Sequence, residues 1–101
     1  GGPYIITAVF QVIANLLDHS MELPGAVAAP RVHHQHLPDR LLAERNAMDS
    51  TTAAALLSMG HRVERARALG SAPTLARRET QWIGVCDPRT GGAAAAQQAL
   101  P

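Results

Sequence analysis

The sequence contains no lysine and only one cysteine among its 101 residues. All nine basic side chains are arginine, a bias that we attribute to genome composition rather than to nine separate needs for guanidinium geometry. The single cysteine excludes an internal disulfide but leaves the cellular compartment open. Nine basic and eight acidic residues give a net charge of +1, so the chain has no overall field to attract nucleic acid or an anionic membrane.

Aromatic residues are scarce, with one tyrosine, one phenylalanine and one tryptophan. Five arginines could in principle form a basic patch for nucleic acid, namely Arg62, Arg65, Arg67, Arg77 and Arg78. Binding of single-stranded nucleic acid usually combines such charges with aromatic side chains on which bases stack. Because no aromatic platform is interleaved here, we predict a solvated strand face and no nucleic-acid partner.

The longest apolar stretch covers residues 5–18 and predicts a helix. Its polar members are Thr7, Gln11, Asn15 and Asp18, which share one narrow helical stripe. The stretch spans about 21 Å, short of the roughly 30 Å of a membrane core, so no membrane span is expected. A helix apolar over most of its circumference is predicted to be buried on most sides, and the remaining residues offer little to cover it. Missing chain or a partner is therefore implied.

The other predicted elements are short and mixed in type, which indicates an α+β fold in one small domain. Asp49 can cap a helix that Gly60 closes. Residues 90–101 are rich in alanine and glycine and are predicted to form a flexible tail. The remaining predictions are a helix at 24–29, a helix at 50–59, strands at 40–44 and 61–66, and a hairpin of 74–77 with 81–86.

A set of short motifs is similar to gamma-glutamyltransferases, in that family's order and nearly its spacing. They are Gly1-Gly2, Ile5-Ile6-Thr7, the run from Gln11 to Asn15, Ala29-Pro30-Arg31, His33-His34-Gln35, Leu37-Pro38-Asp39, the run from Gly60 to Val63, Gly70-Ser71 and Asp87-Pro88-Arg89. The resemblance covers residues 1–89 and implies the C-terminal part of the small catalytic subunit. The chain is accordingly expected to be truncated at its front.

The resemblance implies an N-terminal-nucleophile (Ntn) hydrolase, of which this chain would form part of an α/β/β/α sandwich. A precursor of this kind cleaves itself, and the new N-terminal threonine attacks a gamma-glutamyl amide such as that of glutathione. That threonine would lie upstream of Gly1, so no nucleophile is expected in this chain and the chain alone is predicted to be inactive. Gly1 and Gly2 match the two glycines whose backbone amides bind the oxyanion.

The family resemblance also implies a partner and a compartment. The partner is the remainder of the precursor, namely the large subunit and the first part of the small subunit, and the compartment is periplasmic or extracellular. It implies neither a cofactor nor a metal. Where the family commonly has Ser-Arg, this chain has Pro3-Tyr4, which keeps open a non-catalytic relative that acts as a scaffold or binding module. A related acylase with a different amide substrate is the other alternative.

Three further groups of residues could carry chemistry, and for each we favour a structural role. His33, His34 and His36 could bind a metal, but we expect one or two of these imidazoles to hydrogen-bond the backbone in a loop beside the core. Cys86 and His61 could be a nucleophile and its base, yet a cysteine that ends an apolar strand usually behaves as a small hydrophobe. Asp87-Pro88-Arg89 is interpreted as a turn in which the aspartate accepts local backbone bonds.

Overall fold

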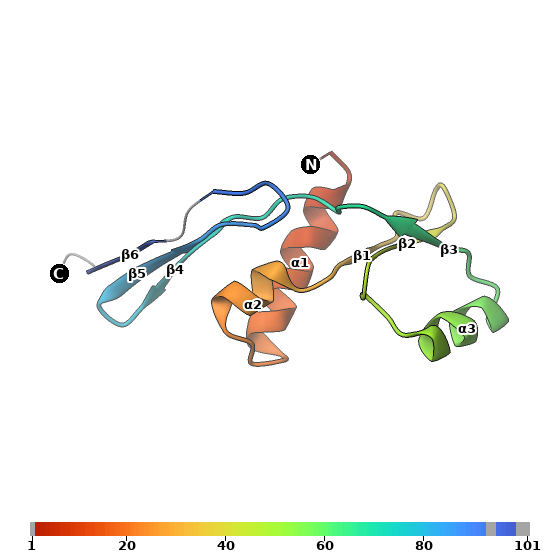
Figure 1. Ribbon diagram of the computed structural model, residues 1–101, viewed down its shortest axis with the longest axis horizontal. Helices are drawn as coiled ribbons and strands as arrows, with labels where there is room; N and C mark the ends of the chain where they lie inside the picture. Colours follow the sequence, from red (N-terminus) through yellow and green to blue (C-terminus); the bar gives the residue numbers. More distant parts are fainter. Residues whose placement is uncertain (1, 93–94, 99–101) are drawn as a thin grey trace.

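The computed structural model describes residues 2–92 and 95–98 and has an α+β fold. Two helices, α1 (Tyr4–Leu17) and α2 (Leu23–Ala28), lie at the centre, with a three-stranded sheet on either side (Figure 1). The molecule is elongated, with principal extents of 53 × 25 × 20 Å. Within the described residues, no helix combines the length and apolar character needed to cross a membrane.

The first sheet has the strand order β1-β2-β3 and carries the helix α3. Strand β1 (Val32–His33) pairs antiparallel with β2 (Leu41–Glu44), and β2 pairs parallel with β3 (Val63–Ala66). The parallel pair is possible because the connection through α3 (Ser50–Ser58) returns the chain to the end of the sheet at which β2 begins, so β3 can run in the same direction.

The second sheet is an antiparallel meander with the order β4-β5-β6. Its strands are β4 (Thr74–Arg78), β5 (Gln81–Val85) and β6 (Ala95–Gln98). The sequence predicted the hairpin of β4 and β5 but placed a flexible tail over residues 90–101, where the structure has β6. The correction has a physical reason, because a strand can pair through backbone hydrogen bonds alone and so leave no apolar pattern. Residues 93–94 and 99–101 lie outside the described residues.

The local signals in the sequence located most elements correctly. The predicted cap of α3 is confirmed, because Asp49 Oδ1 accepts a hydrogen bond from Thr52 N at 2.7 Å. Gly60 follows with a positive φ of 94°, as expected of a glycine that ends a helix. Strand β1 is only two residues long and was not predicted.

Helix α1 forms where the sequence predicted it, but its burial differs from the prediction. Only Ala8 and Val12 are buried in α1, Leu16 is half-buried against the same core, and six other large apolar side chains are exposed. The exposed ones are Ile5, Ile6, Val9, Phe10, Ile13 and Leu17. The expectation of a helix buried on most sides is therefore wrong for this chain, because the other elements cover one side only.

The covered side of α1 includes the polar stripe, beside the buried Ala8 and Val12. Gln11 exchanges two hydrogen bonds with the backbone of Val32, its Nε2 donating to the carbonyl at 2.7 Å and its Oε1 accepting from the amide at 2.9 Å. Asn15 Nδ2 donates to the carbonyl of Ala26 at 3.1 Å. The polar stripe thus binds the backbone of β1 and α2. The six exposed apolar side chains of the helix are not covered by the described residues of this chain.

A glycine allows the connection from β3 to β4 to approach the first turns of α1. Gly70 has a φ of +78°, and a Cβ added there would lie 3.2 Å from Ala8 Cβ and 3.6 Å from Tyr4 Cβ. Both the backbone conformation and the close contact therefore favour glycine at this position.

We expect Gly70→Ala to lower the free energy of unfolding by about 2 to 4 kcal/mol, through the left-handed conformation and overpacking together. The matched control is Gly60→Ala, since Gly60 also has a positive φ but open space at its Cβ position. Urea unfolding of both variants separates the two contributions. An equal loss of stability in the two variants would show that the contact with α1 contributes nothing.

Candidate functional site

Of the two glycines predicted to bind the oxyanion, Gly2 is described and Gly1 lies outside the described residues. Gly2 is exposed, has a φ of +52° and directly precedes the first turn of α1, where its carbonyl accepts from Ile5 N at 3.4 Å. No atom described in this chain lies within 4 Å of a Cβ added there. Amides at a helix N-terminus direct partial positive charge outward, which suits a developing negative charge.

The departure at Pro3 is compatible with this geometry. Pro3 is the N-cap of α1 with a φ of −67°, the value that its ring imposes. An amide at this position has no helical carbonyl partner, so its loss breaks no bond within the helix.

His33 anchors the first turns of α1. Its ring is 2% exposed and meets the Tyr4 ring edge to face, with centroids 4.8 Å apart. Its Nδ1 lies 2.6 Å from Thr7 Oγ1, and its Nε2 lies 2.9 Å from Gln35 Oε1. Both ring nitrogens are thus engaged with protein side chains, so His33 has a structural role, although the sequence predicted hydrogen bonds to the backbone of a loop.

The other two candidate metal ligands, His34 and His36, lie in the loop after β1. His34 Nε2 pairs with Asp39 Oδ1 at 3.2 Å, and its Nδ1 accepts from the backbone of His36. Among the described residues, no group of three or more metal-ligating side chains comes together.

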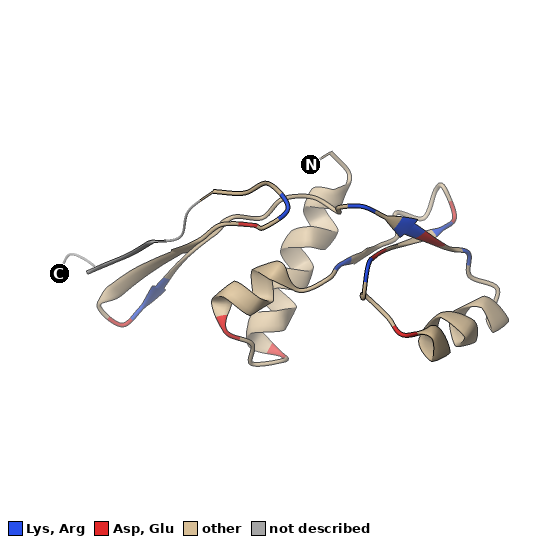
Figure 2. Cartoon of the chain, viewed as in Figure 1, with Lys and Arg blue, Asp and Glu red and all other residues tan. Residues whose placement is uncertain are grey.

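Two other sequence candidates are not brought together as sites. His61 is exposed after α3, whereas Cys86 is half-buried beside Pro24 and Ala28. The five arginines considered as one patch are divided between the two sheets, with Arg77 stacked over Trp82 in the second sheet at 5.9 Å (Figure 2).

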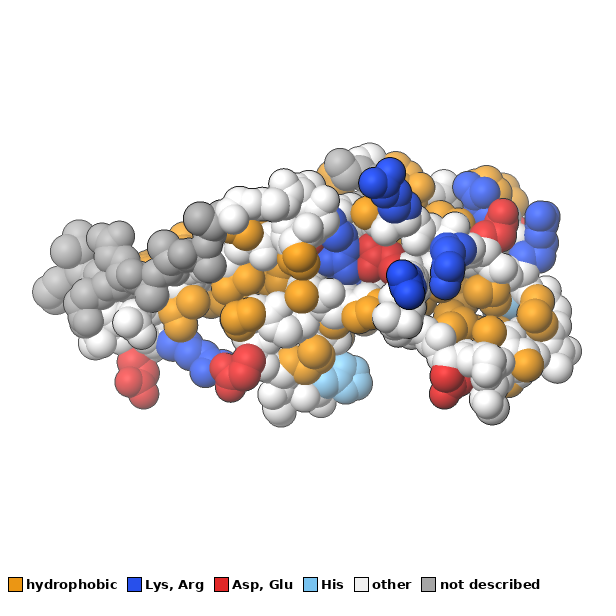
Figure 3. Space-filling view, in the orientation of Figure 1, with side chains coloured by type: hydrophobic (Ala, Val, Ile, Leu, Met, Phe, Trp, Pro, Cys, Tyr) orange, Lys and Arg blue, Asp and Glu red, His pale blue; other side chains and the backbone are white. Residues whose placement is uncertain are grey.

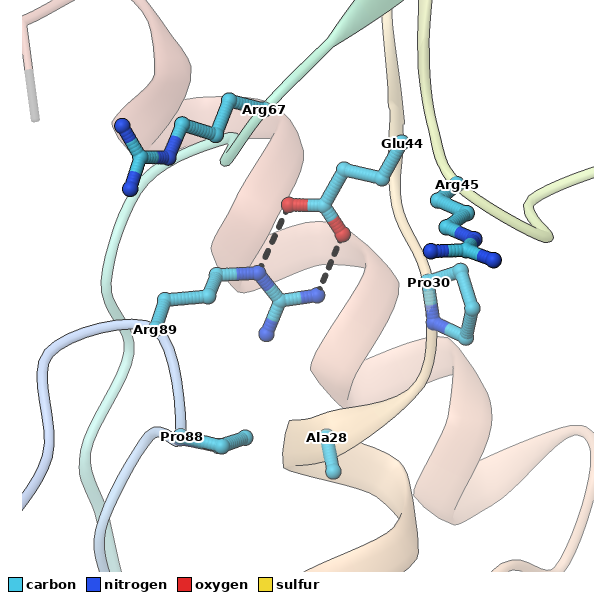
Figure 4. Close-up of a pocket in the computed structure, with 7 residues that line it drawn as sticks. All are labelled: Ala28, Pro30, Glu44, Arg45, Arg67, Pro88 and Arg89. Carbon is cyan, nitrogen blue, oxygen red and sulfur yellow. Dashed lines mark hydrogen bonds and ion pairs between the residues drawn. The ribbon is translucent and has the colours of Figure 1, made fainter.

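An ion-pair cluster that the sequence did not predict lies at the centre of the molecule. We call Arg31, Glu44, Asp87 and Arg89 the central ion cluster. Arg31 Nη2 lies 2.9 Å from Asp87 Oδ2, and Arg89 Nη1 lies 3.0 Å from Asp87 Oδ1. Figure 4 shows Arg89 binding Glu44 through both Nε and Nη2. The cluster joins the connection before β1, the end of β2 and the turn after β5.

The predicted turn at Asp87-Pro88-Arg89 is present, and it serves the cluster. Asp87 Oδ1 accepts from Arg89 N at 3.0 Å, and the Asp87 carbonyl accepts from the amides of Thr90 and Gly91. This turn places the Arg89 guanidinium against Glu44, 45 residues earlier. An acidic residue after the apolar strand residues 41–43 was the available signal, because a charge at a buried strand end requires a partner.

Backbone groups complete the cluster. Glu44 accepts from the amides of Arg31 at 2.9 Å and Leu69 at 2.6 Å, and Asp87 accepts from Ala72 N at 2.8 Å. Arg31 and Arg89 both donate to the carbonyl of Val27, which ties the cluster to the last turn of α2. The four charges are thus paired and hydrogen-bonded, which is what offsets the cost of removing them from water.

These contacts shift the pKa values of the carboxyl groups downward. Burial raises the pKa of Asp87, but the amides of Arg89 and Ala72 and the two guanidinium groups outweigh it and lower this pKa to about 2. Burial likewise raises the pKa of Glu44, and the hydrogen bonds from Arg89, Leu69 and Arg31 outweigh it. The pKa of Arg89 is raised, chiefly by its hydrogen bond with Glu44.

We expect Asp87 to contribute stability that is lost in acid. Its pKa in the folded protein is about 2, below the ordinary 3.8, so its contribution is present above about pH 4 and disappears as the pH falls through about 2. Asp87→Asn should flatten the dependence of the free energy of unfolding on pH in this window. Urea unfolding at several pH values measures the slope, and Asp39→Asn, with a side chain 85% exposed, is the control expected to keep it.

Comparison with solved structures defines the class of protein. Residues covering 92% of the chain superpose on half of a gamma-glutamyltranspeptidase from Pseudomonas nitroreducens, with a TM-score of 0.83 and 34% identity. A Helicobacter pylori gamma-glutamyltranspeptidase is matched over 98% of this chain and 49% of its own, with a TM-score of 0.70 and 32% identity. These enzymes are Ntn-hydrolases, and the α+β fold of this chain resembles theirs.

The chain belongs to the gamma-glutamyltranspeptidase family, whose model matches residues 1–97. It is 35% identical over 91 residues to the glutathione hydrolase proenzyme of Escherichia coli K12, covering 89% of this chain and 16% of that protein. The glutathione hydrolase proenzyme 2 of Schizosaccharomyces pombe is 34% identical over 100 residues, which is 95% of this chain and 16% of that protein. The chain therefore spans about one sixth of the length of these relatives.

Proposed function

We propose that the intact protein cleaves gamma-glutamyl amides such as glutathione and passes the acyl group to water or an amino acid. Residues 1–89 would be the C-terminal part of its catalytic subunit and part of an α/β/β/α sandwich. The observation that supports this proposal is the position of Gly2 just before Pro3, the N-cap of α1, in a chain whose relatives are glutathione hydrolase proenzymes.

The proposed chemistry divides between this chain and the remainder of the precursor. An N-terminal threonine outside residues 1–101 would attack the amide carbonyl, and the C–N bond would break as the amine leaves. Water or an amino acid would then attack the resulting ester and release the threonine. The amides of Gly1 and Gly2 would bind the oxyanion in both steps, and each such donor stabilises a transition state by roughly 3 to 4 kcal/mol.

The exposed apolar face of α1 supports the proposed partner. Six large apolar side chains on this one helix are exposed in the isolated chain. Single exposed apolar residues scattered over a surface are normal, but a group of them on one element indicates an interaction surface. The relatives are about six times longer, so their remaining residues can supply the cover. We therefore infer that the remainder of the precursor packs on α1 and holds the nucleophile near Gly2.

The experiment uses protein expressed from the complete natural reading frame. Intact mass measures self-cleavage, and release of nitroaniline from gamma-glutamyl-p-nitroanilide measures activity. Two fragments with turnover support the proposal. A single uncleaved and inactive chain would contradict it and would favour the scaffold or binding module.

A related acylase is the second candidate, because an Acylase ACY 1 proenzyme from Pseudomonas sp. V22 is 38% identical over 65 residues. Glutaryl-p-nitroanilide, which differs from gamma-glutamyl-p-nitroanilide only by lacking the α-amino group, separates the two activities. A self-cleaved enzyme that prefers the glutaryl amide would be an acylase, whereas preference for the gamma-glutamyl amide supports the first proposal.

A further inference from the structure

A concave site, separate from the region around Gly2, lies over the central ion cluster. Its volume is about 210 Å³, and its walls include Ala28, Pro30 and Pro88. Its charged lining residues are Glu44, Arg45, Arg67 and Arg89, which Figure 4 shows around one opening. The volume is below the roughly 300 Å³ at which drug-sized ligand sites begin, so the site suits only a small molecule or ion.

The strand pairing explains why two arginines meet at this opening. Strands β2 and β3 are parallel, with Glu44 paired to Ala66. The next residues along the chain, Arg45 and Arg67, therefore leave the same edge of the sheet, at the carboxyl ends of the strands.

The charges at the opening do not cancel. Arg89 and Glu44 neutralise each other through a bidentate pair, and they lie in the floor with side chains 9% and 7% exposed. Arg45 and Arg67 are exposed, and among the described residues neither has a hydrogen-bond or ion-pair partner. Figure 4 shows them on either side of the Glu44–Arg89 pair, so two positive charges flank the opening. Figure 3 shows several arginine side chains on the half of the molecule that carries the first sheet.

We propose that this opening binds a small multivalent oxyanion, with Arg45 and Arg67 as its ligands. Each of these two exposed guanidinium groups carries a positive charge that no described side chain offsets, and an anion at the opening would be attracted to both. Guanidinium groups present paired N–H donors that match the oxygens of phosphate or carboxylate. The ligand class is therefore an inorganic phosphate or a short dicarboxylate. This site involves neither Gly2 nor the proposed gamma-glutamyl chemistry.

The test is calorimetric titration of inorganic phosphate into protein expressed from the complete reading frame, with succinate titrated in parallel. We expect saturable binding that weakens about tenfold in Arg45→Gln or in Arg67→Gln, as loss of one charged hydrogen-bonding partner predicts. The double variant should lose binding. Added chloride should weaken binding, because the attraction is electrostatic. The stronger of the two titrants identifies the source of the anion.

The matched control is Arg62→Gln, which removes an exposed arginine before β3 and outside the opening, and which should bind like the wild type. Absence of saturable binding at millimolar phosphate and succinate would overturn the proposal. Binding would also be absent if other segments of the precursor fill the opening, and that result would equally overturn it. Equal weakening in Arg62→Gln and Arg45→Gln would also overturn it, because the effect would then be one of general charge. Measuring binding instead of turnover keeps this result separate from the proposed enzymatic activity.

Discussion

Arg89→Met is expected to lower the free energy of unfolding by about 3 to 5 kcal/mol, the usual cost of breaking a buried ion pair from one side. The substitution removes both contacts to Glu44 and one contact to Asp87. It also leaves the carbonyl of Ala29 without its guanidinium donor. Glu44 and Asp87 are 8% and 0% exposed, so water cannot readily replace the lost partner.

The measurement is urea unfolding of the protein expressed from the complete reading frame, followed by far-ultraviolet circular dichroism. Arg62→Met is the control, because Arg62 is exposed and such substitutions usually change stability by less than about 0.5 kcal/mol. The double variant Arg89→Met with Glu44→Leu should recover part of the loss, since it no longer buries the Glu44 charge unpaired. Equal stability of the Arg89→Met and Arg62→Met variants would mean that the central ion cluster does not stabilise the fold.

Gly2→Pro is expected to lower kcat for gamma-glutamyl-p-nitroanilide by about 100- to 1000-fold in the intact, self-cleaved enzyme. Proline removes the amide that would bind the oxyanion, and its ring also excludes the φ of +52° that Gly2 adopts, so the loss should be at least that of one such donor. KM should change little, because the oxyanion exists only in the transition state and the tetrahedral intermediate. Gly2→Ala keeps the amide but strains a residue with a φ of +52°, at about 1 to 2 kcal/mol, so its kcat should fall less.

Intact mass must first show that each Gly2 variant cleaves itself, so that a failure of processing is not taken for a loss of catalysis. Gly25→Ala is the matched control, because Gly25 lies in α2 and an added Cβ there makes only an ordinary contact, 3.8 Å from Met21 Cε. Its kcat should match the wild type. A Gly2→Pro enzyme with unchanged kcat and a raised KM would place Gly2 in substrate binding instead of oxyanion stabilisation.

The elements that the sequence predicted correctly are those with local signals. Helix α3 follows from the Asp49 side chain at its start and Gly60 at its end, and both residues act within a few positions of themselves. The hairpin of β4 and β5 follows from alternation on either side of a short turn. For the candidate site, Gly1-Gly2 was identified from the family resemblance, and its role in binding the oxyanion stays a prediction.

What the sequence by itself determined is therefore the order of the main elements, the polar stripe of α1 and the family. Only the tertiary structure decided which side of α1 this chain covers, because Gln11 could equally have faced solvent until Val32 was placed beside it. It also decided that Glu44 and Arg89 meet across 45 residues and that Arg45 and Arg67 flank one opening. Charges distant in the sequence acquire partners only when strand pairing and turns bring them together. No local sequence pattern predicts which of these distant charges will meet.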